Sequence, residues 1–168
     1  MSWSEFSALP PRGGGERIRW GEGPREFGVL RLPAGAGPHP VALLLHGGCW
    51  CSEADADYLS HLGAWLADRG WATWTPSFPR SDDPGGGWPG TLAAVGRAAD
   101  RLRILASERP LDAARAVAIG HSSGGHLALW LAARPGLSVE GDAGALRGPA
   151  PLSLRGVIGL APIADLGA

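Results

Sequence analysis

The sequence predicts an α/β fold built on a mainly parallel sheet with helices on both faces. Two observations support this fold class. Short apolar runs of strand length alternate three times with segments whose apolar residues recur at helical spacing. Each connection between these strands is also long enough for the right-handed crossover that parallel pairing requires. Because ligands bind outside the carboxyl ends of the strands in such sheets, we expect the functional residues there.

The composition narrows the partners that the protein can have. The chain has 168 residues, enough for one domain with a sizeable core, and a formal net charge of −1. It therefore has no basic field to attract nucleic acid or an anionic membrane, and we expect neither as a partner. No segment approaches the roughly 20 apolar residues of a membrane span, and the N-terminus lacks a signal-peptide pattern.

Cysteine usage indicates a reducing compartment. The two cysteines, Cys49 and Cys51, are too close together for an ordinary disulfide. They also lack the further Cys or His partners that a zinc site needs at typical ligand spacing. We therefore expect a cytoplasmic protein with no metal and no other cofactor, while its oligomeric state stays open.

The first strands of the fold come from the N-terminal third of the chain. Residues 1–40 are rich in Gly and Pro and form an extension in which "RIRW" (17–20) and "FGVLRL" (27–32) predict an edge hairpin. The run "VALLL" (41–45) is continuously apolar and predicts a strand buried on both faces. We assign 1–168 to a single partial domain, whose core extends from residue 41 through the strand after the third helix.

The next segments predict a helix, a strand and a surface loop. From Asp55, apolar residues recur at helical spacing until Gly70 provides a natural stop. This stripe consists of Tyr58, Leu59, Leu62, Trp65 and Leu66. "WATWT" (71–75) predicts a second buried strand, and the Gly- and Pro-rich segment 76–90 crosses back over the surface.

The remaining elements repeat the alternation. Thr91 is a candidate N-cap for a second helix. Its apolar stripe consists of Leu92, Val95, Ala99, Leu102 and Leu105. "RAVAIG" (115–120) predicts the third buried strand and "SGGHLALWLAAR" (123–134) the third helix. A Gly/Pro loop then leads to a fourth strand, "LRGVIGLAP" (154–162).

The motif "GHSSG", Gly120 to Gly124, has the Gly-x-Ser-x-Gly pattern between a predicted strand and a predicted helix. Its glycines allow a sharp turn and a close approach of the helix, while the hydroxyl of Ser122 is aimed outward. We therefore predict that Ser122 is a nucleophile, with the main-chain N–H of Ser123 at the helix N-terminus as an oxyanion donor. The structural alternative is a glycine-rich turn in which the serine is only a cap.

A second motif, "HGGCW" (46–50), follows the "VALLL" strand. A serine hydrolase of this layout places its other oxyanion donors in that loop. Two glycines there allow main-chain N–H groups to approach a substrate carbonyl that a side chain would block. Because both motifs follow predicted strands at the expected ends, together they predict a serine-hydrolase scaffold.

With these motifs, the chain resembles an alpha/beta-hydrolase of the carboxylesterase and kynurenine formamidase (arylformamidase) group. "HGGCW" matches the His-Gly-Gly-x-Trp pattern of that group, "GHSSGGHLAL" its nucleophile elbow and helix, and "LAPIADL" the strand and turn that follow. The resemblance extends from about residue 41 to the last residue. It implies an acyl-enzyme on Ser122, with Gly48, Cys49 and Ser123 as main-chain oxyanion donors and Gly47 as a further candidate. The implied substrates are carboxylic esters or small amides, including N-formyl aromatics.

A serine nucleophile needs a histidine base and an acid that orients it. In this group, both follow the nucleophile in loops after later strands. Downstream of Ser122 the only histidine is His126, one helical turn on, where its ring is expected to pack or hydrogen bond locally. We expect His46 to shape the oxyanion loop and His121 to point away from Ser122. The two other histidines, His39 and His61, lie in a loop and a helix away from the strand ends.

The acid is equally hard to assign. Asp165 follows the fourth strand and is either the acid or a turn cap, and Asp142 is a loop residue with less support. We therefore expect the acid and the histidine to lie beyond Ala168, so that the fold is truncated at its C-terminus and this chain alone hydrolyses poorly. The alternative is a truncated or non-catalytic hydrolase-like module that binds a ligand or partner without turnover. Trp50 and Trp88 are candidates for lining an acyl pocket, although tryptophans also pack in cores.

Overall fold

The computed structural model describes residues 5, 8–51 and 55–167, and these form a sheet with the strand order β1-β2-β4-β3-β5-β6. Met1 and Ala168, the limits of the predicted domain, lie outside the described residues. The strands are β1 (Glu16–Arg19), β2 (Phe27–Arg31), β3 (His39–Leu45), β4 (Ala72–Pro76), β5 (Leu111–His121) and β6 (Gly156–Leu160). Strands β4, β3, β5 and β6 are parallel, whereas β1 and β2 pair antiparallel at one edge. The mainly parallel sheet and the edge hairpin are both confirmed.

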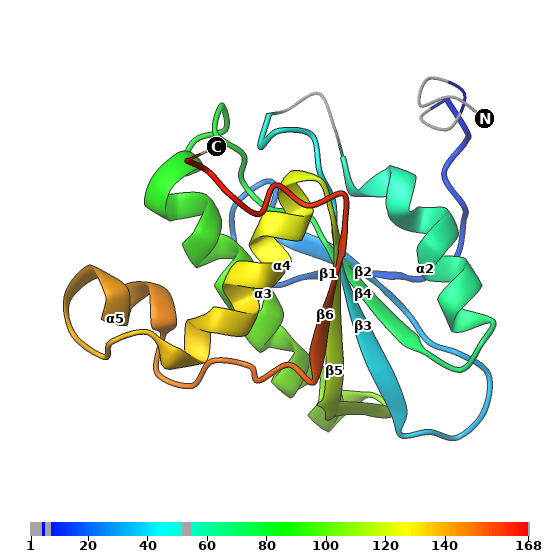
Figure 1. The fold of residues 1–168 in the computed structure, drawn as a ribbon. Coiled ribbons are helices and arrows are strands. Elements are labelled where there is room, and N and C mark those ends of the chain that lie inside the picture. The colour runs from blue at the N-terminus through cyan, green and yellow to red at the C-terminus, as the bar shows by residue number, and fades with distance from the viewer. Residues whose placement is uncertain (1–4, 6–7, 52–54, 168) are drawn as a thin grey trace.

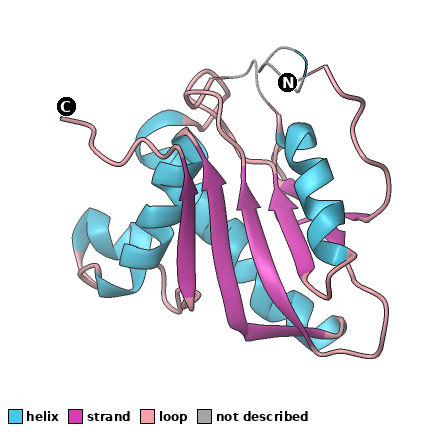
Figure 2. Ribbon diagram, turned by 45° about the vertical axis from the view of Figure 1, so that its right-hand side comes forward, coloured by secondary structure: helices cyan, strands magenta, loops and turns pink. Residues whose placement is uncertain are grey.

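Helices cover both faces of this sheet, as predicted. They are η1 (Ala56–Leu59), α2 (Ser60–Ala67), α3 (Gly87–Glu108), α4 (Ser123–Ala133), η2 (Arg134–Gly136) and α5 (Gly141–Arg147). Figure 1 shows α2 on one side of the sheet and α3, α4 and α5 on the other. The parallel strands all point their carboxyl ends to the same edge (Figure 2), where the loops after β3 and β5 meet. In the described residues, no helix is both long enough and apolar enough to cross a membrane.

The apolar run of β3 is explained by burial on two sides. Leu43 and Leu45 belong to the larger core, which lies between the sheet and helices α3 and α4. Ala42 and Leu44 belong to a smaller core beneath η1 and α2, together with Ile119 of β5. Since successive side chains of a strand point to opposite faces, a strand covered on both faces has no polar alternation.

The edge hairpin is joined to the core through Trp74 of β4. Its ring is fully buried, and its indole N–H donates to the carbonyl oxygen of Ala98 in α3, at 2.9 Å. Gly28 of β2 lies over this ring, because a Cβ there would be 2.4 Å from the indole. The missing side chain therefore lets β2 pair directly beside β4.

The start of the second helix differs from the prediction. Helix α3 begins at Gly87, and its backbone departs from helical geometry at Trp88. Thr91 lies inside the helix and is not its N-cap. Its hydroxyl instead accepts the N–H of Gly87 at 3.0 Å and donates to the carbonyl of Pro79 at 2.8 Å. The threonine therefore fastens the preceding loop to the helix. The stripe predicted from Leu92 to Leu105 is buried as expected.

Helix α5 occupies a segment that the sequence predicted as loop. It holds two glycines, Gly141 and Gly144, and buries one leucine, Leu146. Arg134 fixes it from the end of α4, because its Nε donates to the carbonyl of Leu146 at 3.0 Å. The same guanidinium, only 3% exposed, forms a two-bond ion pair with Asp100 of α3 at 3.0 and 2.6 Å.

Candidate active site

Ser122 stands at the turn between β5 and α4 in a backbone conformation that L residues rarely adopt. Its φ is 54° and its ψ is −122°. The main-chain N–H of Ser122 donates to the carbonyl of Leu160 at 2.9 Å, and its carbonyl accepts the N–H of Gly125 at 2.9 Å. Such strained conformations cost about 1–3 kcal/mol and persist only where the surrounding structure enforces them. The neighbouring strand β6 and helix α4 thus hold the serine in place.

The glycines around Ser122 are required by close contacts. A Cβ on Gly120 would lie 2.0 Å from the carbonyl oxygen of Gly124. A Cβ on Gly124 would in turn lie 2.2 Å from the carbonyl oxygen of Leu45. These contacts let α4 begin directly against the end of β3, so that the loop after β3 meets the serine.

That loop, residues 46–50, is hereafter called the oxyanion loop. Its left-handed backbone includes Gly48 (φ 111°), Cys49 (φ 52°) and Trp50 (φ 59°), and the N–H of Cys51 closes a turn onto the carbonyl of Gly48 at 2.8 Å. A Cβ on Gly47 would lie 2.9 Å from the Cβ of Ser122. Two of the residues implied as donors, Gly48 and Cys49, therefore lie in the loop beside Ser122. The third, Ser123, is the first residue of α4.

Gly47 itself is engaged elsewhere. Its main-chain N–H donates to the hydroxyl of Tyr58, which also hydrogen bonds to Nδ1 of His121 at 3.1 Å. His121 thus turns to Tyr58, in agreement with the expectation that it points away from Ser122. The further candidate Gly47 does not have a spare N–H for an oxyanion. In the sequence, Tyr58 belongs to an apolar helical stripe, and its hydroxyl is the one signal there of a hydrogen-bonding role.

The histidine of the oxyanion loop is buried and structural. Nδ1 of His46 lies 2.9 Å from the carbonyl oxygen of Gly47, and its ring stacks on Phe78 with 4.4 Å between centroids. Burial lowers the pKa of His46, so that the neutral ring is favoured. His46 therefore shapes the loop, as expected.

His126 packs inside the first turns of α4. Its ring meets Trp50 edge-on, with 5.5 Å between centroids, and burial lowers its pKa. Nδ1 of His126 is buried and has no partner among the described residues. The two remote histidines contact loop carbonyls, His39 that of Gly35 and His61 that of Pro10. Within the part of the chain that the structure describes, no side chain hydrogen bonds to the hydroxyl of Ser122.

The two acid candidates lie in local turns. Oδ1 of Asp165 accepts the N–H of Gly167 at 2.8 Å, as a turn cap does. Asp142 lies in the first turn of α5, a helix that contacts α3 and η2. The described residues hold no group of three or more Cys, His, Asp or Glu side chains that could bind a metal ion.

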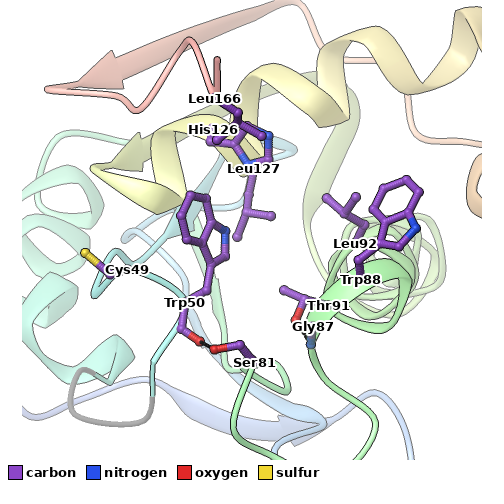
Figure 3. Close-up of a pocket in the computed structure, with 10 residues that line it drawn as sticks. All are labelled: Cys49, Trp50, Ser81, Gly87, Trp88, Thr91, Leu92, His126, Leu127 and Leu166. Carbon is purple, nitrogen blue, oxygen red and sulfur yellow. Dashed lines mark hydrogen bonds between the residues drawn. The ribbon is translucent and has the colours of Figure 1, made fainter. Parts of the chain in front are cut away.

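A cavity of about 310 Å³ opens beside the oxyanion loop. It is lined by Cys49, Trp50, Ser81, Gly87, Trp88, Thr91, Leu92, His126, Leu127 and Leu166. Figure 3 shows Trp50 and Trp88 on opposite sides of it and the sulfur of Cys49 directed away from the other lining residues. Ser81 anchors the Trp50 side, since its N–H and its hydroxyl both donate to the carbonyl of Trp50, at 2.7 and 2.9 Å. Both tryptophans singled out in the sequence therefore line one cavity.

The lining residues that the sequence did not single out come from several elements. Leu92 was expected only as a buried residue of its helix, and Leu166 follows the last strand in a segment without regular structure. The hydroxyls of Ser81 and Thr91 are already bonded to main-chain carbonyls. The cavity is therefore mainly apolar, and its other polar side-chain groups are the imidazole of His126 and the indole N–H groups of Trp50 and Trp88.

The chain is similar to one protein family and to several solved structures. A family model described as BD-FAE matches residues 30–168. Esterase B from Lactobacillus rhamnosis is 21% identical, with a TM-score of 0.78 over 96% of this chain and 53% of that chain. The esterase Est2 from Thermogutta terrifontis is 20% identical, with a TM-score of 0.74 over 95% of this chain and 58% of that chain. An acetyl ester-xyloside bifunctional hydrolase from Caldicellulosiruptor lactoaceticus is 19% identical, with a TM-score of 0.71 over 95% of this chain and 61% of that chain.

At 19–21% identity, the solved structures show the fold of this chain. The chain spans between 53% and 61% of the length of the three solved structures. Est2 has also been solved after phosphonylation by cyclosarin, and esterase B with a tributyrin phosphonate inhibitor. Curated proteins give no match to this chain.

Proposed function

Since the chain belongs to the BD-FAE family, which is alpha/beta-hydrolase-like, we propose that it is a serine hydrolase that acts on carboxylic esters or small amides through Ser122. The predicted alpha/beta-hydrolase fold is confirmed by this family and by the solved esterases. The observation that carries the proposal is the strained backbone of Ser122, with φ 54° and ψ −122°, directly beside the oxyanion loop.

In the proposed reaction, the hydroxyl oxygen of Ser122 attacks the carbonyl carbon of the substrate. The main-chain N–H groups of Gly48, Cys49 and Ser123 stabilise the negative charge that develops on the carbonyl oxygen. The bond to the alcohol or amine then breaks, the leaving group takes the proton that the hydroxyl of Ser122 gives up, and an acyl group remains on Ser122. Water cleaves this acyl-enzyme to the free acid and restores the serine.

The cavity between Trp50 and Trp88 is proposed to hold the apolar part of the substrate. Its lining includes Cys49 of the oxyanion loop and His126, one helical turn after Ser122, and these two residues support the proposal that the cavity lies beside the substrate carbonyl. A volume of about 310 Å³ admits a short acyl chain or a single aromatic ring. Short acyl esters and N-formyl aromatic amides are therefore the substrate classes to compare.

Covalent labelling tests the nucleophile. A fluorophosphonate probe should form an adduct that mass spectrometry maps to Ser122, and Ser122→Ala should abolish it. Ser123→Ala is the matched control, because it removes the neighbouring hydroxyl but keeps the main-chain N–H. An adduct on a different serine, or equal labelling of Ser122→Ala, would remove the assignment.

A substrate panel tests the reaction. Purified protein would be incubated with p-nitrophenyl esters of increasing acyl length and with formyl-anilides. Hydrolysis of either class that is lost in Ser122→Ala supports the proposed reaction and shows which class is preferred. If protein that the probe labels hydrolyses neither class, the result favours the second candidate function, which is binding without turnover.

The second candidate is a hydrolase-like module that binds a carbonyl ligand without turnover. It is favoured by the packing of His126 against Trp50, which leaves no histidine bonded to Ser122 among the described residues. A phenylboronic acid, which forms a tetrahedral adduct with an activated serine, distinguishes the two functions. Binding of benzoate or another planar carbonyl compound without boronate affinity favours the binding module.

A further inference from the structure

We propose that Tyr58 is a positioning residue that fixes the oxyanion loop against residues 120–124, hereafter called the nucleophile turn, and determines which main-chain N–H groups face the substrate carbonyl. This inference rests on the proposed function. It arises from one hydroxyl group that joins three segments of the chain. Tyr58 belongs to η1, Gly47 to the oxyanion loop, and His121 to the last position of β5, next to Ser122.

The hydrogen bonds of this hydroxyl are complementary. A phenolic oxygen can accept from one donor while its own proton goes to an acceptor. Here it accepts the N–H of Gly47, and Nδ1 of His121 lies 3.1 Å away. When His121 carries its proton on Nε2, Nδ1 is the acceptor, so that both directions are satisfied. Burial raises the pKa of Tyr58, which keeps the phenol protonated and able to donate.

The tyrosine is held on a fixed support. Its ring packs against the smaller core beneath η1 and α2, and it meets the ring of His121 edge-on at 5.8 Å. Asp55 caps η1, since its Oδ1 accepts the N–H of Ala56 at 2.6 Å. The same carboxylate pairs with Arg25 at 3.1 Å. The hydroxyl therefore projects from an anchored turn rather than from a free loop.

The opposite side of Gly47 is closed by the nucleophile turn. A Cβ at Gly47 would lie 2.6 Å from the carbonyl oxygen of His121 and 2.9 Å from the Cβ of Ser122. Gly47 is thus held between Tyr58 and the turn that carries Ser122. With its N–H directed to Tyr58, Gly47 is not available as an oxyanion donor, and the donors proposed for this loop are the N–H groups of Gly48 and Cys49. A small rotation of the first peptide would misplace both.

Tyr58→Phe tests this role with a direct structural readout. The variant keeps the ring and its packing but removes the acceptor of the Gly47 N–H. We expect the amide of Gly47 to exchange with solvent about tenfold faster in nuclear magnetic resonance measurements. Trp65→Phe is the matched control, because it changes another aromatic residue of the same helical unit, 52% exposed and outside the site. Unchanged exchange at Gly47 in Tyr58→Phe would overturn the proposal.

The functional readout is the reaction of Ser122. In Tyr58→Phe, the rate of phosphonylation by a fluorophosphonate should fall about 10- to 100-fold, because the donors are no longer aligned. For an activated ester, kcat should fall while KM stays within about twofold, since ground-state binding is unaffected. A rise in KM with unchanged kcat would assign Tyr58 to substrate binding and would contradict the positioning role.

Changes at His121 keep the proposal testable if Tyr58→Phe folds poorly. His121→Asn retains a hydrogen-bonding group near the place of Nδ1 and should keep most of the labelling rate. His121→Leu removes it and should lose about as much as Tyr58→Phe. Equal rates for the two His121 variants would contradict the proposal. If the wild-type protein is not labelled at all, the proposed function fails and the catalytic part of this role fails with it, whereas faster exchange at Gly47 would still confirm the hydrogen bond.

Discussion

Gly120 and Gly124 approach so closely that a methyl group on Gly120 would lie 2.0 Å from the carbonyl oxygen of Gly124. This contact joins the end of β5 to the first turn of α4 across Ser122. A side chain at position 120 would displace the whole turn, because the atom that it meets belongs to the backbone and cannot move alone.

Gly120→Ala should therefore destabilise the protein by about 3 kcal/mol, as overpacking against a rigid neighbour does. Urea unfolding followed by circular dichroism measures this change. Gly136→Ala is the control, since a Cβ there meets nothing within 4 Å and its backbone is not left-handed. It should be neutral or slightly stabilising. Equal midpoints for the two variants would show that the close contact is not enforced.

Removing the side chain of Ser122 should stabilise the fold. At φ 54° and ψ −122°, glycine has no strain to relieve, whereas alanine keeps the Cβ. After the extra backbone entropy of glycine is subtracted, we expect Ser122→Gly to be about 1 kcal/mol more stable than Ser122→Ala. Thermal unfolding of both variants, which equally lack the hydroxyl, isolates the effect. If the alanine variant is the more stable one, the turn is not strained.

The ion pair of Arg134 and Asp100 should be important for stability. Asp100→Ala leaves a guanidinium that is 3% exposed without its counter-charge and removes the acceptor of the Leu152 N–H. Breaking a buried pair in this way costs about 3 kcal/mol. Asp112→Ala, which breaks an exposed pair with Arg115, serves as the comparison and should leave the urea midpoint nearly unchanged. A small effect at Asp100 would mean that water replaces the carboxylate.

Stability should decrease as the pH falls from about 7.5 to about 5.5. Burial lowers the pKa of His46 and of His126 in the folded state, so the unfolded chain binds more protons below the ordinary histidine pKa of about 6.5. Their contribution is therefore complete above that pH and is lost as the solution is acidified. Carboxylates titrate near pH 4, in a separate range. Urea midpoints across this range should vary less in His126→Gln and least when His46→Gln is added; an unchanged slope in the double variant would contradict the assignment.

Turnover by this chain should be slow. Within the described residues no histidine is bonded to Ser122, and loss of the base in a serine triad forfeits about four orders of magnitude or more. Initial rates with p-nitrophenyl acetate, corrected for Ser122→Ala, measure the residual reaction. Fast turnover that His126→Ala or His46→Ala abolishes would instead make an internal histidine the base.

The sequence was sufficient where one pattern dominated. The run 41–45 predicted its strand because it is apolar at every position, and the structure buries it from both faces. The turn at Ser122 was found because only glycine fits the contacts at Gly120 and Gly124. Both features are determined by residues that are adjacent in the sequence, so a short sequence pattern is enough to predict them.

The rest depended on contacts between distant segments. Threonine is a residue type that often caps helices, so the sequence pattern favours Thr91 as an N-cap. Its hydroxyl instead donates to the carbonyl of Pro79, a contact between separate segments that the local sequence does not predict. Helix α5 contains two glycines in its seven residues and is held by Arg134 from another helix, so its own propensity is weak. Tyr58 fits an apolar stripe, and its partner Gly47 becomes apparent only when η1 and the oxyanion loop are side by side.

The pairing of β3 with β5 also sets the order in which reactivity appears as the chain folds. The oxyanion loop and the turn at Ser122 are separated in sequence by β4 and the whole of α3, and they meet through a register that joins Leu45 to Gly120. Such non-local pairing forms only after its loop-closure entropy has been overcome. Before that step, no contact forces Ser122 out of a relaxed backbone conformation. A newly made or partly unfolded chain therefore carries an ordinary serine, and the conformation proposed for the nucleophile exists only in the completed fold.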